Sequence, residues 1–382
     1  MKVLFMHIKG SGISGVWFVN KMLAEALVNK GYDVEFLFIR SHDTSKKVVD
    51  DRIKINVINE KIKWETKHIQ DLKNHLVNKK INLLAKDGCV MVNDKLKLKK
   101  DFIKTKNKIK EINPDVIITS HYQVLDAIPK EYLSRVLNVQ HSSFLYAQDK
   151  KKNFQTFKKY NGKITNAWLC KNSRDKAIGC GLTNNTYVYN PVKLQTSKNA
   201  DVVNNKKLVT ISRLSSVQKR IDLMVRICDK VLKKNKDWVL ELYGPGELDK
   251  ESMDIIRKNK QIKLMGPTDN VKEALLSSSI YLSTSYTEGF ALSLLEANEC
   301  GVPVVSYDFG ESCSEQIPND CGIIVDFDDS KTFEKELNDL MNDKKRLQKY
   351  AKASKKFAQQ FHIENVVEEW SKLFDKVTKK ND

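Results

Sequence analysis

Short apolar runs alternate with segments of helical pattern along almost the whole chain, and this alternation restricts the fold more than any other feature. Strands buried on both faces of a parallel sheet have continuous apolar runs, because helices cover both sides. In the second half, such runs occur at Leu208–Ser212, Trp238–Tyr243, Ile262–Met265, Ile280–Thr284, Val304–Tyr307 and Gly322–Val325. The pattern predicts an α/β fold with a doubly wound, Rossmann-like sheet.

The first half carries the same alternation. Its expected strands are Lys2–His7, Asp33–Ile39, Arg52–Val57, Pro114–Ser120, Arg135–Gln140, Ala167–Cys170 and Thr186–Tyr189. A chain of 382 residues is too long for one ordinary core, so two domains are expected. The polar stretch Ser197–Asn205 is the best linker candidate. We therefore predict domains at 1–195 and 196–360, followed by a last helix within 361–382.

A candidate binding site follows the strand at Ile280–Thr284. Glu288 and Gly289 are expected to form a turn before a helix at Phe290–Glu299, which contains Glu296. A helix N-terminus favours an anion such as a phosphate, and carboxylates accept hydrogen bonds from sugar or ribose hydroxyls. The stretch therefore suits a nucleotide sugar, although a capped helix with two incidental glutamates remains an alternative.

Two cations follow another strand of the same domain. Arg213 and Lys219 lie on a loop after Leu208–Ser212, where a guanidinium and an ammonium could neutralise a diphosphate. Solvated loop charges are the alternative. Gly244 follows a further strand, where a bare backbone could lie beside a nucleotide or form a plain turn.

The first half offers fewer site candidates. The loop with Gly12 and Gly15 follows the strand Lys2–His7, but it matches neither G-x-G-x-x-G nor a P-loop. The next helix has apolar positions at Phe18, Met22, Ala26 and Leu27. His121 and His141 follow expected strands at the sheet edge where ligands bind in such folds, although a structural histidine remains open for both.

The positive charge is concentrated in the first half. The formal net charge is +18, and residues 1–200 hold 37 Lys and Arg against 18 Asp and Glu, a net of +19. This excess predicts an anionic partner: nucleic acid, an anionic membrane surface or an anionic polymer. Residues 60–112 are Lys-rich with a helical pattern, typical of a helix on an anionic membrane or of a core-facing helix with a solvated Lys face.

Cysteine use and hydropathy predict the compartment. The seven cysteines are scattered and include no C-x-x-C pair, which indicates reduced thiols and neither disulfides nor a zinc site. The chain opens on a strand pattern instead of a secretory signal, and no apolar run approaches membrane-spanning length. We expect a cytoplasmic protein.

Taken together, these motifs resemble the retaining family 4 glycosyltransferases of GT-B fold, the glycogen-synthase-like glycosyl transferases group 1. The resemblance rests on Glu288-x7-Glu296 with Gly289–Phe290, on Arg213 with Lys219, on Asn190–Pro191–Val192, and on Gly310 with Glu315. It covers nearly the whole chain and is strongest over 186–326. It implies two Rossmann-like domains facing across a cleft, with a last helix that crosses back to the N-terminal domain.

The resemblance also implies residue roles. Arg213 and Lys219 would grip the donor diphosphate, Glu288 would contact sugar hydroxyls, and Glu296 would bind the ribose. His141 would be the active-site histidine near the donor sugar. The remaining donor contacts would come from Gly12, Gly15, Gly244, Gly289, Phe290, Ala291 and Leu292. No metal or other cofactor is expected, and Asp326–Phe327–Asp328 is interpreted as a loop.

The expected activity is transfer of a sugar from a nucleotide diphosphate sugar, commonly UDP-linked in this family, to a hydroxyl with retention. The basic first half favours a cell-envelope glycan, polymer or lipid-linked acceptor, or peripheral contact with the inner face of the membrane. A phosphorylase, a nucleotide-sugar epimerase and a basic nucleic-acid binder are the alternatives. Two features depart from the family: Gly15 is followed by Val16 instead of a second glycine, and 60–112 matches no motif.

Overall fold

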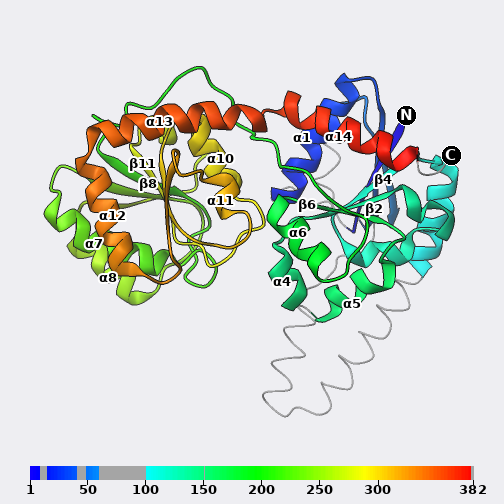
Figure 1. Ribbon diagram of the computed structural model, residues 1–382, viewed down its shortest axis with the longest axis horizontal. Helices are drawn as coiled ribbons and strands as arrows, with labels where there is room; N and C mark the ends of the chain where they lie inside the picture. Colours follow the sequence, from blue (N-terminus) through cyan, green and yellow to red (C-terminus); the bar gives the residue numbers. More distant parts are fainter. Residues whose placement is uncertain (9–14, 41–48, 60–99, 150, 380–382) are drawn as a thin grey trace, which may run out of the picture. The chain divides into compact units, whose positions relative to one another are not determined.

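The computed structural model describes residues 1–8, 15–40, 49–59, 100–149 and 151–379, and these build two twisted sheets flanked by helices (Figure 1). Within these residues, the first sheet has the strand order β3-β2-β1-β4-β5-β6-β7, and the second has the order β10-β9-β8-β11-β12-β13. The described strand registers are all parallel. In both sheets the order reverses beside the first strand, so the prediction of Rossmann-like α/β domains is confirmed.

The strands of the first sheet lie within two residues of their expected bounds. They are β1 (Lys2–His7), β2 (Asp33–Arg40), β3 (Lys54–Asn59), β4 (Val116–Thr119), β5 (Val136–Gln140), β6 (Thr165–Trp168) and β7 (Asn185–Tyr187). The helices between these strands include α1 (Gly15–Asn29), η2 (Tyr122–Ala127), η3 (Lys130–Arg135), α4 (Phe144–Asp149), α5 (Lys151–Tyr160) and α6 (Lys171–Gly179). Residues 100–112 are also helical.

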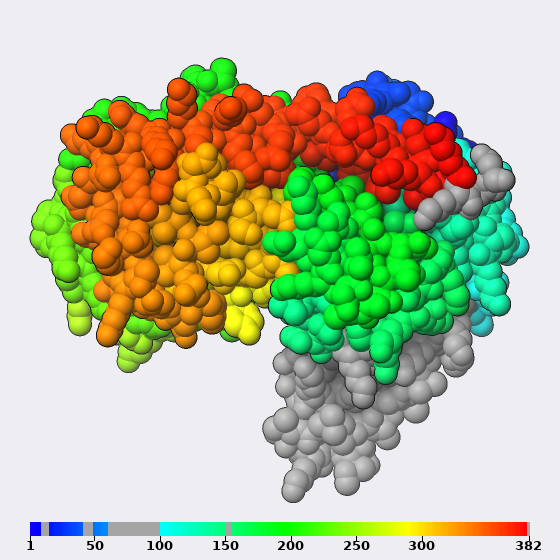
Figure 2. Space-filling view, viewed as in Figure 1, coloured from blue at the N-terminus to red at the C-terminus, as the bar shows by residue number. Residues whose placement is uncertain are grey.

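The second sheet follows its sequence pattern as closely. Its strands are β8 (Lys207–Ile211), β9 (Val239–Tyr243), β10 (Ile262–Gly266), β11 (Ile280–Ser283), β12 (Val304–Tyr307) and β13 (Gly322–Val325). Its helices are α7 (Ile221–Lys234), α8 (Lys250–Lys258), α9 (Val271–Leu276), α10 (Leu292–Glu299), α11 (Cys313–Gln316), α12 (Ser330–Asn342) and α13 (Lys344–Ala358). Figure 2 shows α12 and the start of α13, in orange, on one face of this part of the protein.

One helix starts later than expected. The sequence predicted a helix from Phe290, but α10 begins at Leu292. Ala291 is its N-cap and has an extended backbone with φ −78° and ψ 104°. Phe290 packs between aromatic rings, at 5.5 Å from Tyr189 and 5.8 Å from Phe361. This packing holds the chain in an extended form before the helix.

The described part of the basic segment has a core-facing side. In the helix at residues 100–112, Ile109 and Ile112 are buried. Asp101 is buried as well, and its Oδ2 lies 3.1 Å from Arg40 Nε on β2. For residues 100–112 the core-facing alternative is therefore correct, while 60–99 lie outside the described residues.

The chain divides into two compact units, which are described separately below. One contains Met1–Val139, Thr156–Asn166 and Ser371–Asp382, and the other contains Gln140–Gln155 and Ala167–Trp370. Helix α14 (Ile363–Thr378) has residues in both. In the first unit its Phe374 contacts Tyr32, with ring centroids 5.7 Å apart. The predicted domain limits at 195 and 360 stay a prediction.

Candidate functional site

The most distinctive polar contact in the second unit joins two predicted site residues that are 69 positions apart. Lys219 Nζ lies 2.5 Å from Glu288 Oε1, and the two side chains are 17% and 12% exposed. Lys219 follows β8 and Glu288 follows β11, and these strands are hydrogen-bonded neighbours. Parallel neighbours end at the same sheet edge, so the fold brings the ammonium and the carboxylate together.

The residues that follow β11 hold the backbone of the loop that carries Lys219. The Thr284 hydroxyl donates to the carbonyl oxygens of Lys219 and Arg220 at 2.9 Å and 3.0 Å. The amide of Tyr286 donates to the carbonyl of Gln218 at 2.8 Å. Arg220 has φ 50°, a left-handed conformation that turns the chain into α7. Sequence analysis missed the role of Thr284, although a hydroxyl directly after a buried strand was a usable signal.

Arg213 lies on the same loop but is more exposed than Lys219. Its Nη2 donates to Gln218 Oε1 at 2.9 Å. Gly244 packs against the backbone of Ser212, the residue before Arg213. Gly244 has φ +137°, and a Cβ there would lie 1.7 Å from the Ser212 carbonyl oxygen. Only glycine fits this approach. The structure gives Gly244 a packing role, and a nucleotide contact stays a prediction.

The Glu288–Gly289 turn lies against the end of β5. A Cβ on Gly289 would stand 2.0 Å from the carbonyl oxygen of His141, so the two backbones touch. Ser143 Oγ and Thr287 Oγ1 are also 3.5 Å apart. His141 is half-buried. The structure therefore places the predicted histidine next to the turn that bears Glu288.

The start of α10 already has a partner for one of its amides. The Ala291 amide donates to Gln316 Oε1 at 3.0 Å, and Gln316 Nε2 donates back to the Ala291 carbonyl at 3.0 Å. Gln316 is fully buried and was not a predicted site residue. Phe290 is buried by its aromatic neighbours, so its side chain is a packing group. Leu292 is the first residue of the helix.

Glu296 lies in the second turn of α10 and has an unusual acidity. Burial raises the pKa of its carboxyl to about 7, and the positive charge of Lys193 opposes the shift only in part. A low-dielectric surrounding disfavours the charged carboxylate. A carboxyl with a pKa near neutrality is typical of functional sites, although burial within a core has the same effect.

A small cavity of about 10 Å³ lies between these elements, which is room for no more than about one water molecule. Its polar lining includes Lys219, Thr284 and Ser293. The Tyr281 hydroxyl donates to Ser293 Oγ at 2.8 Å. A ligand as large as a nucleotide therefore does not fit inside this cavity.

The other predicted residues are dispersed. Gly12 lies outside the described residues, and Gly15 is the first residue of α1 in the other unit. His121 is half-buried after β4, and burial lowers its pKa. Glu315 accepts hydrogen bonds from the amides of Lys171 and Asn172 and from the Tyr189 hydroxyl, at 2.8–3.0 Å, so it caps α6.

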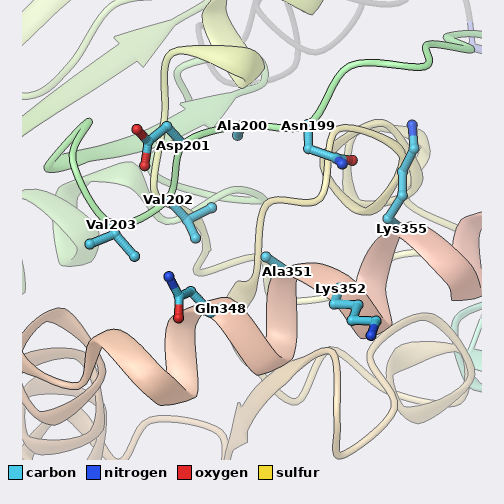
Figure 3. Close-up of a pocket in the computed structure, with 9 residues that line it drawn as sticks. All are labelled: Asn199, Ala200, Asp201, Val202, Val203, Gln348, Ala351, Lys352 and Lys355. Atoms are coloured by element: carbon cyan, nitrogen blue, oxygen red, sulfur yellow. The ribbon is translucent and has the colours of Figure 1, made fainter.

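The cavity shown in Figure 3 contains none of the predicted site residues. It has a volume of about 320 Å³ and lies between residues 199–203 and α13. The ammonium of Lys355 on its edge is bound to Glu299, with Nζ 2.9 Å from Oε1. Among the described residues, no group of three or more His, Cys, Asp or Glu could hold a metal ion. None of the described helices is long and apolar enough to span a bilayer.

Comparison with known proteins finds matches over the second sheet and its helices. Residues 193–357 match the family described as glycosyl transferases group 1. The chain is 30% identical over 170 residues to a poly(glycerol-phosphate) alpha-glucosyltransferase of Bacillus subtilis, covering 43% of this chain and 25% of that protein. It is 28% identical over 162 residues to a poly(ribitol-phosphate) alpha-N-acetylglucosaminyltransferase of Staphylococcus aureus, covering 41% and 33%. The chain thus spans a third or less of these relatives.

The whole described fold also has a solved counterpart. The Anabaena HepE protein, in a crystal structure with UDP and glucose, superposes with a TM-score of 0.73 over 98% of this chain and all of that chain. The sequence identity is 14%, so this likeness establishes the fold alone. Together with the two doubly wound sheets, it supports a GT-B architecture.

Proposed function

We propose that this chain transfers a sugar from a nucleotide diphosphate sugar to a hydroxyl, because residues 193–357 match the family described as glycosyl transferases group 1. The observation that carries the proposal is the Lys219–Glu288 pair beside the Gly289–His141 contact. One cation for a diphosphate, one carboxylate for sugar hydroxyls and one histidine lie around a single turn. Such groups can stabilise the departing diphosphate and orient the sugar as a sugar–phosphate bond breaks.

In the proposed reaction, positive groups stabilise the departing diphosphate. Lys219 and Arg213 supply full charges, and the N-terminal end of α10 adds partial charge. These groups neutralise the leaving group themselves, so the proposed mechanism uses no metal ion. Glu288 orients the sugar ring through its hydroxyls, and His141 lies near the anomeric carbon. The acceptor hydroxyl attacks from the face that the phosphate leaves and gives its proton to an oxygen of the departing phosphate, so the anomeric configuration is retained.

The donor base is proposed to be uridine. UDP is the nucleotide in the HepE crystal structure, and that protein shares the fold of this chain. Glu296 would bind the ribose hydroxyls as a carboxylate.

The acceptor is proposed to be an anionic cell-envelope glycan, polymer or lipid-linked chain. The support is the +19 charge of residues 1–200 together with relatives that glycosylate poly(glycerol phosphate) and poly(ribitol phosphate). Such an acceptor would be met at the cytoplasmic face of the membrane. The phosphorylase, epimerase and nucleic-acid-binding alternatives gain no support from these relatives.

The test compares two ion pairs of the same sheet. Lys219→Ala and Arg213→Ala should each lower turnover of a nucleotide sugar by roughly 100-fold or more, because a positive group at the leaving diphosphate is lost. Lys207→Ala is the matched control for Lys219→Ala. Lys207 pairs with Glu241 at 3.1 Å, its side chain is 19% exposed, and it lies at the opposite end of β8.

The outcome separates catalysis from stability. Lys207→Ala should keep wild-type turnover, and circular dichroism should show all three variants folded. Wild-type turnover in Lys219→Ala, or an equal loss in Lys207→Ala, would reject the assigned role.

A further inference from the structure

The first unit contains a large basic pocket far in sequence from the glycosyltransferase motifs. It has a volume of about 690 Å³, within the range of small-molecule sites. Its rim carries Lys106, Lys130, Lys159, Lys163 and Asp126. Four positive charges and one negative charge give this rim a net charge of +3 at neutral pH.

The floor of the pocket is apolar. Tyr160 and Ile128 are buried there, and Leu133 is half-buried. Floor and rim come from different segments: the helix at 100–112, the η2–η3 stretch and the end of α5. A pocket built by three separate segments is held by the fold and does not depend on one loop.

The single carboxylate has a defined place. Asp126 Oδ1 accepts hydrogen bonds from the Lys159 ammonium and, at 2.6 Å, from the Tyr160 hydroxyl. Burial alone would raise its pKa, but the bonds from Lys159 and Tyr160 lower the pKa of Asp126 below its ordinary value. Asp126 is therefore a charged acceptor at neutral pH; its side chain is 56% exposed, and its second oxygen, Oδ2, can accept a hydrogen bond from a hydroxyl.

The charges outside the rim leave its net positive charge in place. Glu131, the nearest further acid on η3, is 2.9 Å from Lys110 and is neutralised there. Lys163 Nζ donates to the carbonyl of Lys159 at 3.2 Å, which uses one of its three protons. The rim therefore keeps its positive potential.

We propose that this pocket binds a phosphodiester-linked carbohydrate polymer, as a docking site for the acceptor of the proposed function. The lysines would bind phosphate oxygens, Asp126 would accept a hydroxyl of the adjoining sugar or alditol, and the apolar floor would contact its carbon face. The carboxylate favours an occupant in which hydroxyls lie between the phosphates, and a pocket of about 690 Å³ admits a flexible chain more readily than the flat surface of an anionic bilayer. The lining of the pocket also lacks the exposed aromatic rings on which the bases of a nucleic acid would stack.

The site should raise the local concentration of a long acceptor without taking part in bond transfer. A polymer anchored here would have its reactive end presented repeatedly to the donor. A short neutral acceptor would gain nothing from the pocket. This difference in substrate dependence distinguishes docking from catalysis.

The test uses a double charge reversal, Lys130→Glu with Lys163→Glu, because both side chains are exposed and should be tolerated in the fold. The reversal changes the rim from +3 to −1. The matched control is Lys345→Glu with Lys349→Glu, which makes the same charge change at exposed positions on α13. Thermal melting checks that both variants fold.

The first measurement is calorimetric affinity for soluble poly(glycerol phosphate), with no donor present. The pocket variant should bind roughly tenfold or more weakly than the wild type and should show a shallower salt dependence, while the control should bind as the wild type does. Neutral dextran should bind to none of them. Equal weakening in both variants would overturn the proposal, as would binding to phosphatidylglycerol vesicles in place of the polymer.

The second measurement separates this proposal from the proposed function on which it rests. With a nucleotide sugar present, the pocket variant should raise KM for the polymer and leave kcat unchanged. If transfer to the polymer occurs and KM does not change, the docking site is wrong. If polymer binding depends on the pocket but no transfer occurs with any nucleotide sugar, the proposed function is wrong and the docking site stands.

Discussion

The burial of Glu296 predicts how the stability of the folded protein changes with pH. Burial raises the pKa of this carboxyl from 4.5 to about 7 in the folded protein. A raised pKa means that the folded protein prefers the protonated form. The folded state therefore has its full stability below pH 4.5 and loses stability as the pH rises through 7. Glu296→Gln removes the titration while keeping the shape of the side chain.

The size of the effect follows from the two pKa values. At about 1.4 kcal/mol per pKa unit, the difference between 4.5 and 7 amounts to about 3 kcal/mol. This is an upper limit, because the half-buried side chain keeps part of its contact with solvent. We expect Glu296→Gln to match the wild type at pH 4.5 and to be more stable by up to about 3 kcal/mol at pH 8. At roughly 2–4 °C per kcal/mol, that is a rise of several degrees in Tm.

Differential scanning calorimetry at the two pH values measures this gap. The comparison of wild type with variant cancels the titration of other groups, such as His121, whose lowered pKa acts in the opposite direction. Glu273→Gln, an exposed carboxyl on α9, is the control and should show no pH-dependent gap. A gap for Glu296→Gln that is the same at pH 4.5 and pH 8, or a less stable variant at pH 8, would refute the reasoning.

Two further predictions concern the close packing at Gly289 and the buried ion pair between Asp101 and Arg40. Gly289→Ala should destabilise the second unit by about 2 kcal/mol or more and weaken donor binding, because its Cβ would meet the His141 backbone at 2.0 Å. Gly179→Ala has open space and should melt like the wild type; equal melting of the two variants would contradict this account. Asp101→Ala should cost roughly 3–5 kcal/mol, because it leaves Arg40 charged and buried. Asp50→Ala breaks an exposed pair with Arg52 and should change Tm far less, so similar losses in urea unfolding would argue against the buried-charge explanation.

The sheets were predictable because their strands are short, apolar and separated by helical pattern. β12 and β13 match their expected bounds, β11 ends one residue early, and β8 is shifted by one residue at each end. The meeting of Lys219 and Glu288 followed from the same logic, since both come after strands of one sheet. The pattern of apolar strands and helices was therefore sufficient to predict this contact, because parallel strands end at the same edge of the sheet.

Contacts between distant segments could not be predicted in this way. On α1 the sequence pointed to Phe18, Met22, Ala26 and Leu27, but of these only Leu27 is fully buried. The buried face includes Asn20, whose amide lies 3.2 Å from both His7 Nε2 and Ser120 Oγ. A polar residue satisfied by distant partners is invisible to a hydrophobic pattern.

The prediction of where α10 begins was wrong for a related reason. The local sequence allows a helix from Phe290, but Phe290 packs against the rings of Tyr189 and Phe361, and Ala291 after it has an extended backbone. Gln316, which bonds both ways with the Ala291 backbone, lies 25 positions further along the chain. No spacing rule connects such a residue with the motif.

The link between Lys219 and Glu288 has a consequence for ligand recognition. A free lysine samples many rotamers, and arresting it costs up to about 2 kcal/mol. Here the carboxylate already restrains the ammonium, so that entropy is lost when the protein folds and not when a ligand arrives. An incoming diphosphate would thus meet an ammonium that is already oriented. The Glu288 carboxylate would then be free to accept hydrogen bonds from the sugar hydroxyls.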